Sequence, residues 1–101
     1  MKKKCFDVFG QEIKINYSKV PVVNENNQIL AGFYSIPDHQ IFIGPANEKE
    51  TTLTLYHELF HAIIYRTGAA QIISFDAQEI LCEGFANFIY ENFELRKTKR
   101  K

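Results

Sequence analysis

Cysteine is scarce in this sequence: Cys5 and Cys82 are the only two among 101 residues. Two cysteines are too few for the disulfide scaffold that stabilises many small secreted domains. The sequence also shows no charged-then-apolar leader followed by a cleavage site. We therefore expect a protein of the reducing cytoplasm.

Long apolar runs are missing as well. The longest spans only a few residues, far fewer than the ~20 needed to cross a bilayer, so a membrane-spanning segment is excluded. Internal repeats, low-complexity tracts and linkers are also absent, which predicts a single domain over residues 1–101. Nine phenylalanines and five tyrosines supply the apolar area that disordered chains lack.

The sequence has no net charge, because twelve basic side chains balance twelve acidic ones. The basic residues gather in tails of about residues 1–4 and 96–101, whereas residues 5–95 carry four basic and twelve acidic side chains. Short terminal basic runs are typical of solvated tails. An acidic body argues against a nucleic-acid-binding face. We therefore expect neither a nucleic acid nor a membrane as partner.

The first half of the sequence has the alternation typical of strands. Short stretches rich in β-branched residues occur at residues 13–17, 29–36 and 40–43. Polar turns at residues 24–27 and 37–39 separate them. This pattern predicts a small sheet of about three strands, antiparallel or mixed.

The second half has a helical period instead. Asn47 and Glu50 resemble a capping box, which predicts a helix from residue 48 to 66, and a second helix is expected from about residue 76 to about 94. The fold class is therefore α+β, a small sheet followed by two packed helices. Candidate inward positions of the second helix are Ile80, Cys82, Phe85, Ala86 and Ile89.

The first expected helix carries the sequence His-Glu-Leu-Phe-His at residues 57–61. His57 and His61 are four residues apart and share a helix face, so their imidazoles can reach one cation. Neutral imidazole suits Zn²⁺, and Glu58 can reach a water molecule on that ion. A catalytic zinc site normally has three protein ligands, so one more is required.

The second expected helix offers Glu79 and Glu83, again four residues apart. Seventeen residues separate His61 from Glu79, enough for a turn of helix, a loop and a return helix. One carboxylate can bind the metal while the other accepts a hydrogen bond from a ligating histidine. The residues alone leave open which does which. His39 and Cys82 are weaker candidates, better explained as a loop histidine and a small core residue.

The sequence resembles the small ImmA/IrrE-type and phage-encoded HExxH zinc metallopeptidases over about residues 28–93. The resemblance rests on residues 57–62 within the first expected helix, on residues 79–87 of the glutamate helix, and on a hairpin at residues 32–34 and 41–43. It implies a minimal gluzincin-like fold and an origin in a phage or mobile element.

The resemblance also assigns the two carboxylates. In thermolysin-like relatives, an acidic residue four positions after the metal-binding glutamate supports a zinc-binding histidine. By this resemblance Glu79 binds Zn²⁺ together with His57 and His61, and Glu83 supports one of these histidines.

We therefore expect a zinc-dependent endopeptidase with one Zn²⁺ per chain, which hydrolyses peptide bonds through a metal-activated water. Glu58 would be the general base, and a peptide or protein substrate would pair with an edge strand at residues 40–43. Tyr34, Tyr56 and Tyr65 are candidate donors to the developing oxyanion. The alternative is a non-catalytic, zinc-stabilised protein-interaction module, in which Glu58 would have no role.

Overall fold

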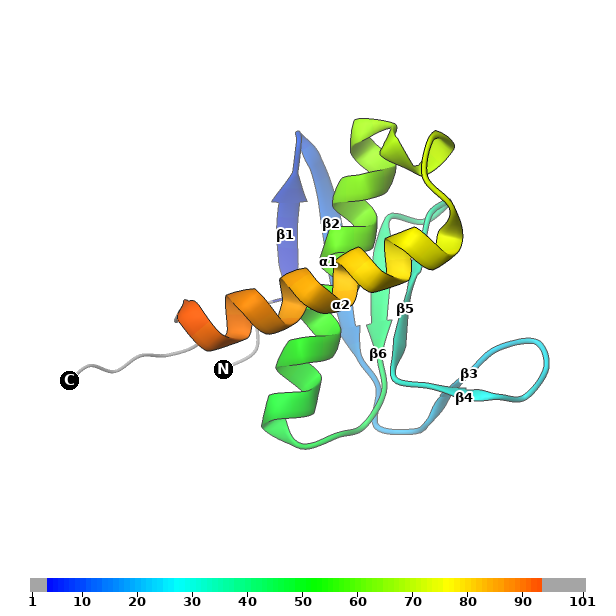
Figure 1. Cartoon of the computed structure of the whole chain (residues 1–101). Helices are drawn as coiled ribbons and strands as arrows, with labels where there is room; N and C mark the ends of the chain where they lie inside the picture. The colour runs from blue at the N-terminus through cyan, green and yellow to red at the C-terminus, as the bar shows by residue number, and fades with distance from the viewer. Residues whose placement is uncertain (1–3, 94–101) are drawn as a thin grey trace.

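The computed structural model describes residues 4–93 and confirms the α+β class, with a sheet region followed by two helices (Figure 1). Apart from Lys4, the basic tails expected from the sequence lie outside these residues. The elements in chain order are β1 (Cys5–Val8), β2 (Gln11–Tyr17), β3 (Val22–Val23), β4 (Ile29–Leu30), β5 (Gly32–Ser35), β6 (Gln40–Ile43), α1 (Glu48–Thr67), the short 3₁₀ turn η1 (Ala69–Gln71) and α2 (Phe75–Asn92).

The main sheet has four strands in the order β1-β2-β6-β5 and is mixed, since β2 and β6 run parallel and the other two pairs antiparallel. The prediction of about three strands missed β1 and β3. The stretch 29–36 was wrong as a single strand: β4 pairs with β3 in a separate two-stranded ribbon, while β5 pairs with β6. Ala31 lies between β4 and β5, and its carbonyl accepts a hydrogen bond from the Gly44 N–H at 2.8 Å. This bond fixes the position at which the chain passes from pairing with β3 to pairing with β6.

The placement of β6 at a sheet edge is also wrong. β6 lies between β2 and β5, and β5 is the edge strand (Figure 1). The physical reason lies in the run Ile41-Phe42-Ile43. Ile41 and Ile43 are only 0% and 1% exposed, as is typical of a strand with neighbours on both sides.

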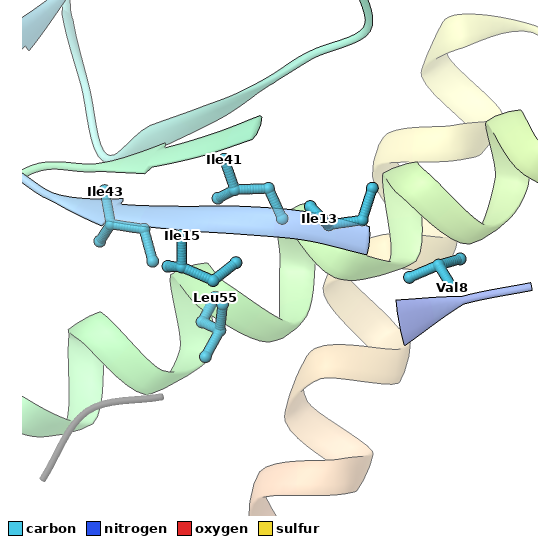
Figure 2. Close-up of a cluster of buried hydrophobic side chains, with 6 residues drawn as sticks. All are labelled: Val8, Ile13, Ile15, Ile41, Ile43 and Leu55. Carbon is cyan, nitrogen blue, oxygen red and sulfur yellow. The ribbon is translucent and has the colours of Figure 1, made fainter. Parts of the chain in front are cut away.

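The core lies between the sheet and α1. Alternate residues of β2 and β6 point to the same sheet face and meet Leu55 of α1 (Figure 2). The buried cluster consists of Val8, Ile13, Ile15, Ile41, Ile43 and Leu55. Gly32 lets α1 approach β5 closely, because a Cβ there would lie 2.7 Å from the Phe42 carbonyl oxygen and 2.8 Å from Thr54 Cγ2. This close approach brings the edge strand beside the middle of α1.

Both helices begin at side-chain caps. Asn47 Oδ1 accepts a hydrogen bond from the Glu50 N–H at 2.8 Å, as the capping pattern predicted, and Ser74 Oγ accepts one from the Ala77 N–H at 3.1 Å. Gly68, with φ of +87°, ends α1 in the left-handed conformation that favours glycine. The observed helices therefore begin and end within two residues of the expected bounds.

α1 lies between the sheet and α2, and α2 crosses it on the side away from the sheet (Figure 1). Because α2 packs against essentially one helix, only a narrow face of it is covered. Cys82 and Ala86 are buried as expected, but Ile80 and Phe85 are 73% and 45% exposed, so their assignment to the core was wrong.

Candidate metal centre

α1 carries the two histidines of the HExxH sequence on the face that meets α2. His57 and His61 are one helical turn apart, with ring centroids 5.0 Å from each other. Their side chains are only 18% and 12% exposed. The pair is thus largely shielded from solvent, and the partners of its ring nitrogens come mostly from α2.

Glu79 of α2 lies opposite both histidines. Its Oε1 is 3.0 Å from His57 Nε2, and its Oε2 is 3.0 Å from His61 Nε2. The candidate ligand atoms of these three residues all lie within 4.8 Å of one another, and among the described residues they are the only such group of histidine, cysteine and acidic side chains. The structure therefore brings together the three residues for which the sequence predicts metal binding.

The outward ring nitrogens also meet acceptors on α2. His57 Nδ1 lies 3.2 Å from Glu83 Oε1, which is the contact expected of Glu83. Glu83 Oε2 accepts a hydrogen bond from Asn87 Nδ2 at 3.2 Å, which holds the carboxylate in place. His61 Nδ1 lies 3.2 Å from Gln78 Oε1. Gln78 was not among the predicted site residues, and its place beside Glu79 in the sequence does not by itself show that it faces His61.

The bonding of His57 is incomplete without a cation. A carboxylate accepts hydrogen bonds only, and a neutral imidazole donates from one nitrogen only. His57 has a carboxylate oxygen at each nitrogen, so one contact lacks a donor unless a second proton or a metal ion is present. The two oxygens of Glu79 each face one Nε2 atom at 3.0 Å, so both imidazoles converge on a single carboxylate.

Glu58 lies beside this group but outside it. It is 8% exposed, and burial, reinforced by the charge of Glu79, raises its pKa from the ordinary 4.5 to about 7, although His61 opposes the shift. A carboxyl group with a pKa near neutrality can both take up and release a proton at neutral pH, as a general base must. Its catalytic role stays a prediction.

A cleft of about 490 Å³ opens beside Glu58, His61 and Glu79. β5 contributes one wall, and the beginning of α2 contributes another. The lining is mainly apolar and aromatic, and its remaining members are Leu30, Gly32, Phe33, Tyr34, Ile36, Tyr65, Ala70, Phe75 and Gln78.

Two of the three tyrosines considered as oxyanion donors line this cleft. Tyr34 and Tyr65 do so, with ring centroids 6.4 Å apart, whereas Tyr56 is buried and is not part of the lining. The Tyr34 hydroxyl is buried without a hydrogen-bond partner, and burial and the neighbouring Tyr65 raise its pKa. Tyr34 and Tyr65 therefore remain candidates, and Tyr56 does not.

The two weaker metal-ligand candidates lie outside the group. His39 occupies the loop between β5 and β6 with a left-handed φ of +54°. Cys82 is fully buried, and its burial, with the charges of Glu79 and Glu58, raises its pKa to about 12. Its sulfur is not among the ligand atoms that converge at His57, His61 and Glu79, so Cys82 acts as a packing residue between the helices.

No family model matches the sequence, and neither a curated protein nor a solved structure matches the chain. Within residues 4–93, no helix is both long and apolar enough to cross a bilayer.

Proposed function

We propose that the protein is a zinc-dependent endopeptidase with a minimal gluzincin-like arrangement of sheet, HExxH helix and glutamate helix. One observation carries the proposal. The Nε2 atoms of His57 and His61 both face the Glu79 carboxylate at 3.0 Å, while the Nδ1 atom of His57 faces a second carboxylate. Such a group of acceptors fits a bound cation, and two imidazoles with one carboxylate suit Zn²⁺.

Zn²⁺ held by these three residues would polarise the scissile carbonyl group and acidify a water molecule beside it. Glu58 would take the proton from that water and deliver it to the leaving amine. Its buried position and raised pKa support this role, because a base that must later act as an acid works best with a pKa near the working pH. Tyr34 or Tyr65, both in the cleft, would donate to the developing oxyanion.

The edge strand β5 is the best support for a peptide substrate. Within the described residues β5 pairs with β6 on one side only, and Gly32, Phe33 and Tyr34 also line the cleft. An extended peptide that adds to the free edge would have its backbone held beside Glu58 with little demand on its side chains. This assignment replaces β6, which has no free edge. A peptide or protein in the cytoplasm remains the expected substrate.

The decisive experiment compares cleavage of a whole proteome by the zinc-loaded wild type and by a Glu58→Gln variant. We expect new peptide termini with the wild type and at least ~100-fold slower cleavage with the variant, which should still bind zinc. Glu25→Gln, which alters an exposed carboxylate in the β3–β4 turn, serves as the control and should behave as the wild type. Equal cleavage by Glu58→Gln would refute the mechanism. Zinc binding without any cleavage would favour the non-catalytic interaction module.

A further inference from the structure

His61 is contacted by three residues at the beginning of α2. The Phe75 ring lies nearly parallel to the imidazole, with ring centroids 6.1 Å apart and 9° between the planes. Gln78 Oε1 lies 3.2 Å from His61 Nδ1, and Glu79 Oε2 lies 3.0 Å from His61 Nε2. Gln78 and Glu79 follow Phe75 by three and four residues, so all three share the helix face that meets His61.

The two histidines differ in the partner of their Nδ1 atoms. His57 Nδ1 meets the carboxylate of Glu83, whereas His61 Nδ1 meets the uncharged amide of Gln78 through its oxygen. An amide oxygen can only accept, so this contact requires a proton on His61 Nδ1. A neutral imidazole carries one ring proton, and Nε2 then keeps its lone pair for a cation beside Glu79.

Gln78 lies on a firmly held part of α2. Its N–H donates to the Ser74 carbonyl at 3.0 Å, and the Ser74 hydroxyl caps the same turn by accepting from the Ala77 N–H at 3.1 Å. The contact between Gln78 and His61 is also partly buried, which reduces competition from water. A side chain on a capped helix can orient its partner more precisely than one on a loop.

We propose that Gln78 is a positioning residue of the metal centre, which holds His61 in the tautomer and orientation that direct Nε2 towards Zn²⁺. This role rests on the proposed function, because it takes His61 to be a zinc ligand. Gln78 also lines the cleft beside Glu58, so its competing role is contact with a substrate. The two roles have different consequences, because only the first changes the affinity for zinc in the absence of substrate.

The test is a zinc titration of the whole chain against a competing chelator, without substrate. Gln78→Met keeps the length of the side chain but has only a weakly accepting sulfur, and it should weaken zinc binding ~10 to 100-fold. Gln78→Asn, whose amide is one carbon shorter, should weaken it similarly. Gln78→Glu keeps an acceptor oxygen at the same distance, and it should bind zinc at least as tightly as the wild type.

Matched controls and a second measurement separate positioning from other effects. Gln71 is an exposed glutamine in η1 that does not line the cleft, so Gln71→Met and Gln71→Glu should leave zinc affinity unchanged. The second of these adds the same charge as Gln78→Glu without a contact to His61. Nitrogen NMR of the zinc-loaded wild type should show the ring proton of His61 on Nδ1. Circular dichroism confirms that each variant is folded.

Several results would overturn the role of Gln78. These are wild-type zinc affinity in Gln78→Met, zinc binding by Gln78→Glu as weak as that of Gln78→Met, or a proton on His61 Nε2 in the zinc-loaded protein. Unchanged zinc affinity with a raised KM for a cleaved peptide would make Gln78 a substrate-binding residue instead. A wild type that binds no zinc would refute the proposed function itself, whereas a zinc-binding wild type matched by Gln78→Met would refute only the positioning role.

Discussion

Replacing Glu58 by glutamine should stabilise the metal-free protein at alkaline pH. Burial raises the pKa of Glu58 from the ordinary 4.5 to about 7, so the folded state disfavours the carboxylate that the unfolded chain ionises freely. The free-energy cost of ionising Glu58 in the folded state is nearly absent below pH 4.5, the pKa in the unfolded chain. It grows as the pH rises towards about 7, the pKa in the folded state, and is complete above that value. Since each pKa unit corresponds to about 1.4 kcal/mol, the cost at about pH 8 is ~3 kcal/mol.

The glutamine variant cannot ionise and escapes this cost. Urea unfolding in the presence of a chelator should therefore show Glu58→Gln more stable than the wild type by up to ~3 kcal/mol at about pH 8, and by well under half of that at about pH 5. Bound zinc should reduce this difference in stability between Glu58→Gln and the wild type, because a nearby divalent cation favours the ionised carboxylate of Glu58. The exposed Glu25→Gln control should show no such pH dependence. A Glu58→Gln variant no more stable than the wild type at about pH 8 would refute the desolvation argument.

Four further substitutions test other parts of the account. Glu79→Ala should abolish tight zinc binding, whereas Glu83→Ala should weaken it only ~10 to 100-fold; zinc titrations decide, and the reverse order would exchange the two roles. His39→Asn should leave the stability nearly unchanged, because asparagine tolerates the left-handed φ of +54°. It should also leave the zinc affinity nearly unchanged, and a loss of zinc binding in the same titration would make His39 a ligand. Gly32→Ala should lower stability by ~1 to 3 kcal/mol in urea unfolding, because its Cβ would lie 2.7 Å from the Phe42 carbonyl oxygen, and an unchanged midpoint would disprove that close approach.

The helical half of the fold followed from local sequence signals. The Asn47 cap and Gly68 lie next to the helix they delimit, and the period of 3.6 is fixed by residues close in sequence. The candidate metal ligands could be predicted for the same reason. His57, His61 and Glu79 come from two consecutive helices joined by a short connection. Gln78 was missed because its role depends on the relative rotation of the two helices, which the spacing alone does not set.

The strand pairings were harder to predict, because they depend on an atypical turn and on contacts between segments far apart in the sequence. The β1–β2 hairpin turns at Phe9 and Gly10, both with positive φ, and phenylalanine is an unusual residue at the first of these positions, where asparagine is typical. The parallel pairing of β2 with β6 joins segments about 25 residues apart, for example Ile15 with Ile41. No local sequence pattern predicts such a pairing. That pairing places β6 inside the sheet and leaves β5 at the edge.

The central claim is that His57, His61 and Glu79 hold one zinc ion, and elemental analysis tests it most directly. Protein purified without chelators should contain about one zinc per chain, and a His57→Ala, His61→Ala double variant that remains folded should contain none. A wild type that takes up no zinc, or a double variant that retains the same metal content, would contradict the account.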